Sequence, residues 1–133
     1  MWPEPVERIA ALMRAAGVQG ALEELPPDAK RPSGMSLRAA GFDCDGRTLV
    51  ALVPADRAID RERLAAAAGC RALQPAPFPA FPFQGARVLL ERSALAVTTV
   101  WVEAGSPRHY LALAPTDLGR LLRCQSADFV LDD

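Results

Sequence analysis

The segment 98–122 constrains the fold most, because signals for a strand, a turn, a second strand and a helix follow one another in it without a gap. The residues from Thr98 to Glu103 follow the period-two pattern of a half-buried strand. Gly105-Ser106-Pro107 then interrupts the strand, since glycine adopts unusual backbone angles and proline has no N–H to donate. A strand over 109–114 and a helix that begins at Pro115 follow. We expect a binding site at this polar turn.

The remaining segments add helices and strands in an irregular order. Asp45-Gly46 is a strong signal for a two-residue β-hairpin, and Asp60 and Gly69 are suited to begin and end a helix. The four prolines of 74–82 exclude a helix interior or a central strand and predict a surface linker or a rigid loop. We also expect a helix over 5–16, a loop over 26–34, and strands over 18–25, 35–44, 47–53, 87–90 and 127–131. This order predicts an α+β domain with a mixed sheet.

The composition suits one domain that spans 1–133. Hydrophobic residues make up 50 % of the 133 positions, which is enough for a core, and no internal repeat or domain boundary interrupts them. The net charge of −1 does not call for a nucleic-acid partner. Lys30 is the only lysine among the basic residues, and the planar guanidinium of arginine holds phosphate in a bidentate way, so local patches could still bind RNA. A genome rich in arginine codons explains the same bias.

The cysteines and the N-terminus favour a cytoplasmic protein without a metal or cofactor. Cys44, Cys70 and Cys124 are odd in number and form no CxxC pair, which argues against a structural zinc site. An odd set of thiols suits a reducing compartment better than a disulfide-linked exterior. The first residues carry Glu4 and Glu7 and no long apolar run, so they predict neither a signal peptide nor a membrane span.

Two long segments resemble one protein family. Residues 50–69 contain a strand, a turn with aspartate and a helix, and residues 100–122 contain the Gly-Ser-Pro turn; the final Ala127-Asp128-Phe129 is also similar. Together these segments resemble the YbaK/prolyl-tRNA-synthetase-associated domain. The resemblance implies an aminoacyl-tRNA deacylase with a mixed, mostly antiparallel sheet or barrel-like core flanked by helices. It also implies the 3′ end of aminoacyl-tRNA as a partner, with an aminoacyl-tRNA synthetase as a further candidate.

The chain departs from this family at its pocket lysine. Met35-Ser36-Leu37 matches the family's Lys-Ser-Leu strand with methionine in place of lysine, whereas counting back from Asp45-Gly46 puts Arg38 at that position. We prefer the second register because it needs no insertion in the hairpin. Neither register keeps a lysine. The family's helix after the first strand is shortened to the loop 26–34, and its Pro-Phe-Gly loop to 81–85.

The turn and one arginine are the candidates for chemistry. Backbone N–H groups of Gly105 and Ser106 could stabilise the oxyanion that forms when an ester is hydrolysed, and glycine allows close approach of a substrate. Arg38 could bind a phosphate or a carbonyl oxygen but stays protonated and cannot act as a base. We expect substrate contacts from Pro107, His109, Phe83, Gly85 and Asp56.

Each candidate also has a purely structural interpretation. The turn could be a plain strand connection, and Arg38 could reach solvent from its strand. Histidine is a common acid or base in catalysis, but the strand position of His109 favours a surface or hydrogen-bonded structural histidine. Asp56 could bond within its turn, and the phenylalanines of 78–83 could pack in the core instead of stacking on a base.

The resemblance leaves two hypotheses for the function. The first is an editing hydrolase that removes a wrongly attached small amino acid from tRNA with a water activated by the substrate's ribose hydroxyl. The second is a catalytically degenerate binding module of the same fold, which recognises an aminoacyl-tRNA end, a nucleotide or a protein. An unrelated enzyme on a similar scaffold stays open, because a fold does not determine a function.

Overall fold

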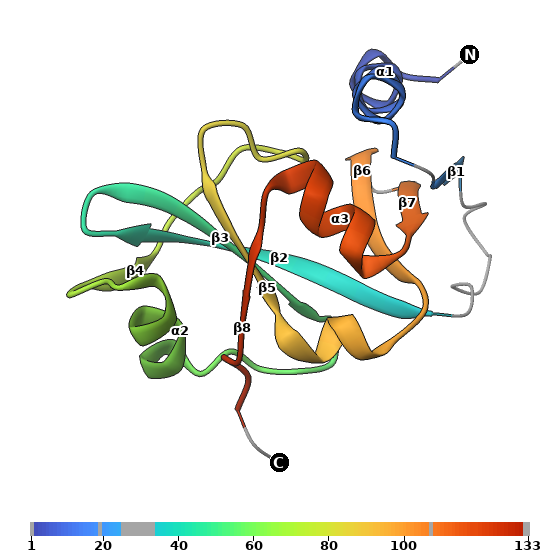
Figure 1. Ribbon diagram of the computed structural model, residues 1–133. Coiled ribbons are helices and arrows are strands. Elements are labelled where there is room, and N and C mark those ends of the chain that lie inside the picture. The colour runs from blue at the N-terminus through green and yellow to red at the C-terminus, as the bar shows by residue number, and fades with distance from the viewer. Residues whose placement is uncertain (1, 19, 25–33, 107, 132–133) are drawn as a thin grey trace.

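A long strand, β2 (Met35–Cys44), runs through the middle of the sheet and pairs with three other strands (Figure 1). The structure is a computed structural model that describes residues 2–18, 20–24, 34–106 and 108–131. The other elements in this part of the chain are α1 (Glu4–Ala16), β1 (Ala21–Glu24), β3 (Arg47–Pro54), α2 (Arg61–Ala68), β4 (Leu73–Pro75), β5 (Arg87–Glu91), the 3-10 helix η1 (Arg92–Ala96), β6 (Val100–Ser106), β7 (His109–Leu113), α3 (Pro115–Leu122) and β8 (Gln125–Ala127).

The sheet mixes parallel and antiparallel pairs. Its order is β1-β7-β6-β2-β3-β5-β8, and β4 pairs with β2 off this path. Parallel pairs join β2 to β6, β3 to β5 and β5 to β8, and the other pairs are antiparallel. The pair of β2 and β6 is short, since it is limited to Met35↔Val100 and Ser36↔Trp101. The predicted α+β class with a mixed sheet is confirmed, and helices lie against the sheet (Figure 1).

Local sequence signals explain the hairpin and two of the helices. Asp45 and Gly46 adopt φ angles of 52° and 89°, the left-handed backbone that a tight hairpin turn needs, and β2 and β3 pair without an insertion from Leu37↔Pro54 to Cys44↔Arg47. The Asp60 carboxylate accepts hydrogen bonds from the N–H groups of Glu62 and Arg63 at the start of α2. Left-handed glycines end α1 and α2, as the sequence predicts.

Two apolar cores lie on opposite faces of β2 and β3. The first, here called the β6 core, contains Val50 and Leu52 of β3 together with inward residues of α1, β6, β7 and α3. The second, here called the α2 core, contains the alternate β3 residues Leu49, Ala51 and Val53 with residues of α2 and the C-terminal segment. Because successive side chains of a strand point to opposite faces, β2 and β3 serve both cores at once.

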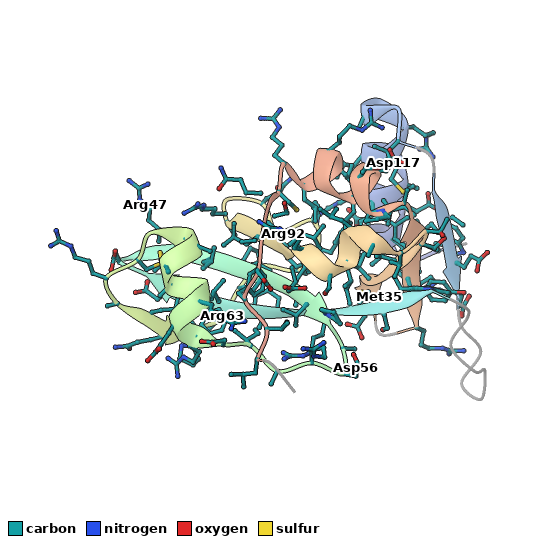
Figure 2. The ribbon with its side chains drawn as sticks, turned by 60° about the horizontal axis from the view of Figure 1, so that its bottom comes forward. Met35, Arg47, Asp56, Arg63, Arg92 and Asp117 are labelled. Atoms are coloured by element: carbon teal, nitrogen blue, oxygen red, sulfur yellow. A yellow bond between two sulfur atoms is a disulfide. The ribbon has the colours of Figure 1, made fainter. Side chains whose placement is uncertain are left out.

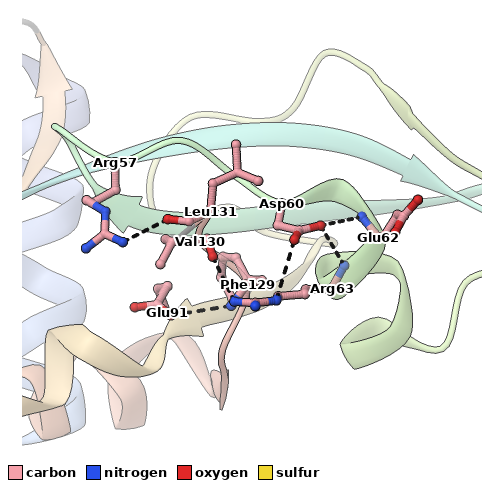
Figure 3. A network of polar contacts seen from close by, with 8 residues as sticks. All are labelled: Arg57, Asp60, Glu62, Arg63, Glu91, Phe129, Val130 and Leu131. Carbon is pink, nitrogen blue, oxygen red and sulfur yellow. Dashed lines mark hydrogen bonds and ion pairs between the residues drawn. The ribbon is translucent and has the colours of Figure 1, made fainter. Parts of the chain in front are cut away.

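A buried glutamate holds the C-terminal segment against the α2 core (Figure 3). Glu91 is 1 % exposed and accepts hydrogen bonds from the backbone N–H of Ser93 at 2.8 Å and of Phe129 at 3.4 Å, and also from the Ser93 hydroxyl. A buried carboxylate needs such donors to replace its lost hydration. Glu91 therefore anchors η1 and Phe129 at once, on the α2 side of the sheet.

Three of the expected boundaries differ in the structure. The proline-rich segment contributes a short strand, β4, which pairs with β2 at Phe42↔Pro75 and is compatible with proline because it has no second neighbour on the sheet path. Strand β6 continues through Gly105 to Ser106 instead of ending before the glycine. The final strand covers Gln125–Ala127, and Val130 forms an isolated bridge with Ile59. The expected loop 26–34 lies almost entirely outside the described residues.

The cysteines differ from the expectation of free thiols. Cys44 and Cys70 form a disulfide that joins the end of β2 to the residue after the Gly69 cap of α2. The expectation is thus wrong for two of the three thiols, and the cysteine set no longer argues for a reducing compartment. Cys124 is free, and burial raises the pKa of its thiol to about 12. No helix among the described residues is long and apolar enough to cross a membrane.

Candidate functional site

The predicted turn lies where β6 meets β7 and is distorted by a β-bulge. Glu103 pairs with Tyr110 and Ser106 pairs with His109, so Ala104 and Gly105 are inserted between consecutive partners on β7. A bulge takes backbone groups out of the regular ladder and re-aims the strand, and bulges are frequent beside active sites. Pro107 lies outside the described residues. The bulge therefore provides irregular backbone at the end of β6, where the sequence predicts the oxyanion donors.

His109 is buried beside this turn instead of lying at the surface. The residue is 5 % exposed, its Nε2 lies 3.9 Å from Oε2 of Glu24, and its ring meets the Trp2 ring edge-on at a centroid distance of 6.1 Å. Glu24 also lies 3.7 Å from the Arg108 guanidinium, which is more than half exposed. The histidine is thus enclosed by the N-terminal segment and by β1, with a carboxylate within reach of its ring.

Sequence reasoning missed Trp2 and Glu24 as neighbours of the turn. Trp2 and Glu24 are far from His109 in the chain, and the pairing Glu24↔His109 between β1 and β7 brings the carboxylate there. The signal that could have found them is the alternation of β1, which puts Leu22 and Glu24 on the same face of a strand. Only the strand order decides that this face covers His109.

A second polar contact lies on the other face of the same hairpin. The Tyr110 hydroxyl donates a hydrogen bond to Oε2 of Glu23 at 2.7 Å, and its ring packs on Trp101 with 4.0 Å between centroids. Burial, together with the hydrogen bond and the negative charge of Glu23, raises the pKa of Tyr110 to about 12. The phenol is therefore protonated at neutral pH and serves as a donor, not as a base.

Arg38 lies on the face of β2 that is turned away from the β6 core. Its neighbours Leu37 and Ala39 pack in or against the β6 core, so the alternation directs Arg38 to the α2 side. Its Nη2 donates a hydrogen bond to the backbone carbonyl oxygen of Arg57 at 2.8 Å. Met35 is also packed against the β6 core and lies on the face opposite to Arg38.

Residues 81–85, here called the phenylalanine loop, lie on the face of β2 that the β6 core covers. Phe81 and Phe83 are 8 % and 5 % exposed, and both belong to the β6 core together with Ala104, the residue before Gly105. Gly85 follows at the surface with a φ of 84°, which glycine adopts without strain. The expectation that these phenylalanines pack, and do not form an open linker, is confirmed for Phe81 and Phe83.

Asp56 lies at the open end of the β2–β3 hairpin (Figure 2). It is exposed in the turn after β3, where the N–H of Ala55 donates to the carbonyl oxygen of Ser36 at 2.8 Å.

A surface hollow of about 390 Å³ lies at the start of β6, the end opposite to Ser106, and is lined by Gly34, Val97, Thr98 and Thr99. Among the described residues no group of three or more His, Cys, Asp and Glu side chains could hold a metal ion.

Comparison with solved structures finds this architecture in other proteins. The chain superposes on a proposed trans-editing enzyme for prolyl tRNA synthetase with a TM-score of 0.82 and 18 % identity, covering 99 % of this chain and 100 % of that one. The chain has the YbaK-like fold. No family model matches it, and no curated protein matches it.

Two further structures share the YbaK-like fold at low identity. A hypothetical protein gives a TM-score of 0.77 at 13 % identity, over 93 % of this chain and 99 % of that chain. A proposed signal transduction protein from Marinobacter aquaeolei VT8 gives a TM-score of 0.69 at 20 % identity, over 92 % of this chain and 31 % of that chain. Such identities establish the fold, while chemistry has to be argued from the residues present.

The YbaK-like fold of this chain separates the candidate residues into two groups. The end of β6, His109, Phe83 and Gly85 belong to the side of the β6 core, whereas Arg38 packs toward the loop before α2. The first group offers backbone donors, a buried imidazole and a rigid apolar support. The second group offers the Arg38 guanidinium, which donates a hydrogen bond to the backbone carbonyl oxygen of Arg57.

Proposed function

We propose that this protein hydrolyses the ester of an aminoacyl-tRNA that carries a wrongly attached small amino acid, and that residues 1–133 form one editing domain. The observation that carries the proposal is the likeness over 99 % of the chain to a proposed trans-editing enzyme, combined with the bulge at the end of β6. A bulge with glycine in it lets backbone N–H groups approach a substrate carbonyl closely.

The proposed reaction needs no nucleophile from the protein. A water oxygen adds to the ester carbonyl and gives its proton to the free hydroxyl of the terminal ribose, which at the same time passes its own proton on toward the ester oxygen of the ribose. The carbonyl carbon then becomes tetrahedral, and its oxygen becomes negatively charged. N–H groups of Gly105 and Ser106 stabilise that charge, a type of contribution worth about 3 kcal/mol per donor in other hydrolases. The bond to the ribose oxygen breaks, that oxygen keeps the proton relayed from the water by the neighbouring hydroxyl, and a free amino acid and an uncharged tRNA leave.

The neighbouring residues bound the pocket in this proposal. Phe83 and Gly85 form one wall, His109 borders the turn, and Pro107 is a further proposed substrate contact. Arg38 lies on the α2 side and Asp56 lies in the exposed turn after β3. Both take part through the loop that they border, since Arg38 holds the carbonyl of Arg57. A small pocket admits small side chains and excludes larger ones by steric overlap.

The partner in this proposal is the 3′ end of a charged tRNA, with an aminoacyl-tRNA synthetase as a second partner that would deliver it. Charged tRNA is used in the cytoplasm, so the proposal also places the protein there. Arg108 is exposed beside the turn and could contact a phosphate of the acceptor end.

The decisive experiment measures deacylation of tRNA-Pro charged with Ala, Cys, Ser or Pro and of the cognate charged tRNAs. Wild type is compared with Gly105→Val, in which the added side chain blocks the turn. Gly119→Val is the matched control, because a Cβ at Gly119 meets no atom within 4 Å. Selective hydrolysis that is lost in Gly105→Val and kept in Gly119→Val supports the proposal. Absence of hydrolysis on every substrate by folded wild type refutes it.

One observation favours a second candidate, a binding module without hydrolysis. Neither Met35 nor Arg38 replaces the family's lysine with a group of the same chemistry, and the Arg38 guanidinium is engaged with a backbone carbonyl on the α2 side. In this case the same charged tRNAs bind and are protected, so that their spontaneous deacylation becomes slower than without protein.

A further inference from the structure

Phe78 is an exposed aromatic side chain on the side of β2 that carries the phenylalanine loop. It is 38 % exposed, and the other large exposed apolar side chains of the described residues are Leu95 and Leu131 at 42 % and 47 %. Single exposed apolar residues are ordinary in proteins and need no function. Phe78 differs from the two leucines because its ring packs against other aromatic rings.

The supporting rings form a series that leads into the β6 core. Phe78 lies 6.0 Å from Phe83 between ring centroids, at an interplanar angle of 54°, and Phe83 lies 5.5 Å from Phe81 at 76°. Phe81 and Phe83 are buried, whereas Phe78 is the outermost ring. The outer ring therefore rests on a fixed base and keeps part of its surface open.

The backbone around Phe78 is held as firmly as its ring. Ala76 donates a backbone hydrogen bond to the carbonyl oxygen of Gly41 at 3.0 Å, so the segment lies directly on β2. A Cβ at Gly41 would come within 2.3 Å of Cδ1 of Phe78 and 2.5 Å of the Ala76 carbonyl oxygen, so this approach requires glycine. Pro77 and Pro79 fix φ on either side of Phe78. A ring held this way loses little conformational entropy when a ligand covers it.

The position of the ring connects it to the proposed site. Phe83, its direct neighbour, belongs to the β6 core with Ala104, the residue before Gly105, and precedes Gly85 of the expected substrate loop. The last bases of a tRNA acceptor end are unpaired. Unpaired bases are commonly recognised by stacking on an aromatic ring, whatever their identity.

We propose that Phe78 is a stacking platform for an unpaired base at the 3′ end of the RNA, a contact that rests on the proposed function. The ring supplies binding and orientation and takes no part in bond breaking. The contact holds the terminal nucleotides while the ester lies at the end of β6.

A hydrolysis-independent binding measurement tests the platform. The probe is an uncharged RNA minihelix whose terminal adenine is replaced by a fluorescent purine analogue, because stacking on an aromatic ring quenches its emission. Wild type is expected to quench the probe, and Phe78→Ala is expected to weaken binding about five- to hundredfold with loss of quenching. Phe78→Tyr retains the ring and should keep both the binding and the quenching. Leu95→Ala is the control for removal of an apolar side chain with similar exposure.

Two further results bear on the platform. Gly41→Ala displaces the segment under Phe78 without removing the ring, and it should reduce quenching too, with thermal melting used to confirm that each variant is folded. Equal binding and quenching by Phe78→Ala and wild type, or no binding by wild type, overturns the inference.

Failure of the stacking platform can be told apart from failure of the proposed hydrolase function. If wild type hydrolyses no charged tRNA but quenches the probe, and Phe78→Ala does not quench it, the platform stands and the hydrolase proposal fails. If hydrolysis is present and Phe78→Ala leaves KM and quenching unchanged, the platform fails and the hydrolase proposal stands.

Discussion

Arg38 in the middle of β2 donates a hydrogen bond to the backbone carbonyl oxygen of Arg57, with 2.8 Å between Nη2 and that oxygen. The side chain of Arg57 in turn donates to the carbonyl oxygen of Leu131 at 2.8 Å, and Arg63 donates to that of Val130 at 3.1 Å (Figure 3). Arginines thus connect β2, the loop before α2 and the C-terminal segment through main-chain carbonyls. This gives Arg38 a structural role on the α2 side, whatever further role it has.

The position of Arg38 leads to a prediction about the missing lysine. A lysine at position 35 would enter from the face of the β6 core, whereas one at position 38 would keep to the α2 side. Under the proposed function we expect Met35→Lys to raise the deacylation rate by about a hundredfold, the order of one added oxyanion donor, and Arg38→Lys to leave it unchanged or lower it. Single-turnover deacylation of the panel measures both. A larger gain from Arg38→Lys would instead support the register that places Arg38 at the lysine position.

Reduction of the disulfide should lower the stability of the fold. Cys44 and Cys70 are 26 residues apart, and closing a loop of that length stabilises a protein by about 3 kcal/mol in the chain-entropy model. We expect the double variant Cys44→Ala/Cys70→Ala to lose about this free energy of unfolding in urea. Wild type treated with dithiothreitol should match it, and Cys124→Ala, which removes the free thiol, is the control. Identical urea midpoints for oxidised and reduced wild type would contradict the expectation.

Tyr110 should make the stability depend on pH in the alkaline range. Its pKa is about 12 in the folded protein against 10.0 for the ordinary group, so the folded state binds the proton more tightly than the unfolded state. The associated stability is present below pH 10 and is lost as the pH rises through 12. Absorbance titration of the phenol measures the pKa, and Glu23→Gln should lower it because the negative charge is removed. An unshifted phenol in wild type would exclude the buried contact.

The contribution of the Asp60 cap of α2 to the free energy of unfolding should be measurable with a single substitution. Its carboxylate accepts from two N–H groups at 3.1 Å each, and loss of such a cap costs about 1 kcal/mol. Asp60→Ala is expected to lower the free energy of unfolding by this amount, while Asp60→Asn keeps most of it. Asp128→Ala, at an exposed position near the end of the chain, is the control. A loss as large for Asp128→Ala as for Asp60→Ala would show that charge, and not the cap, matters.

Features encoded by neighbouring residues could be predicted from the sequence. Asp45-Gly46, Asp60 and Gly69 determine a turn, a helix start and a helix end through the backbone angles and hydrogen bonds of adjacent residues. The resemblance at 50–69 and 100–122 led to the fold, which the structural comparison bears out. The roles of Gly105, Ser106 and the other candidate site residues stay predictions, because a role depends on a substrate as well as on a position.

The tertiary structure decided what depends on contacts between distant segments. Adjacent residues alone specify the Asp45-Gly46 hairpin and the glycine ends of α1 and α2, since these features need only a few neighbouring positions. The sequence by itself could not determine that β2 meets β6 for two pairs and then leaves it, or that His109 is enclosed by Trp2 and Glu24. The pairing of Cys44 with Cys70 and the side of β2 that Arg38 occupies depend in the same way on packing. Strand order and the distribution of side chains between two cores are properties of the whole chain, because each is set by the burial of apolar surface from many segments at once.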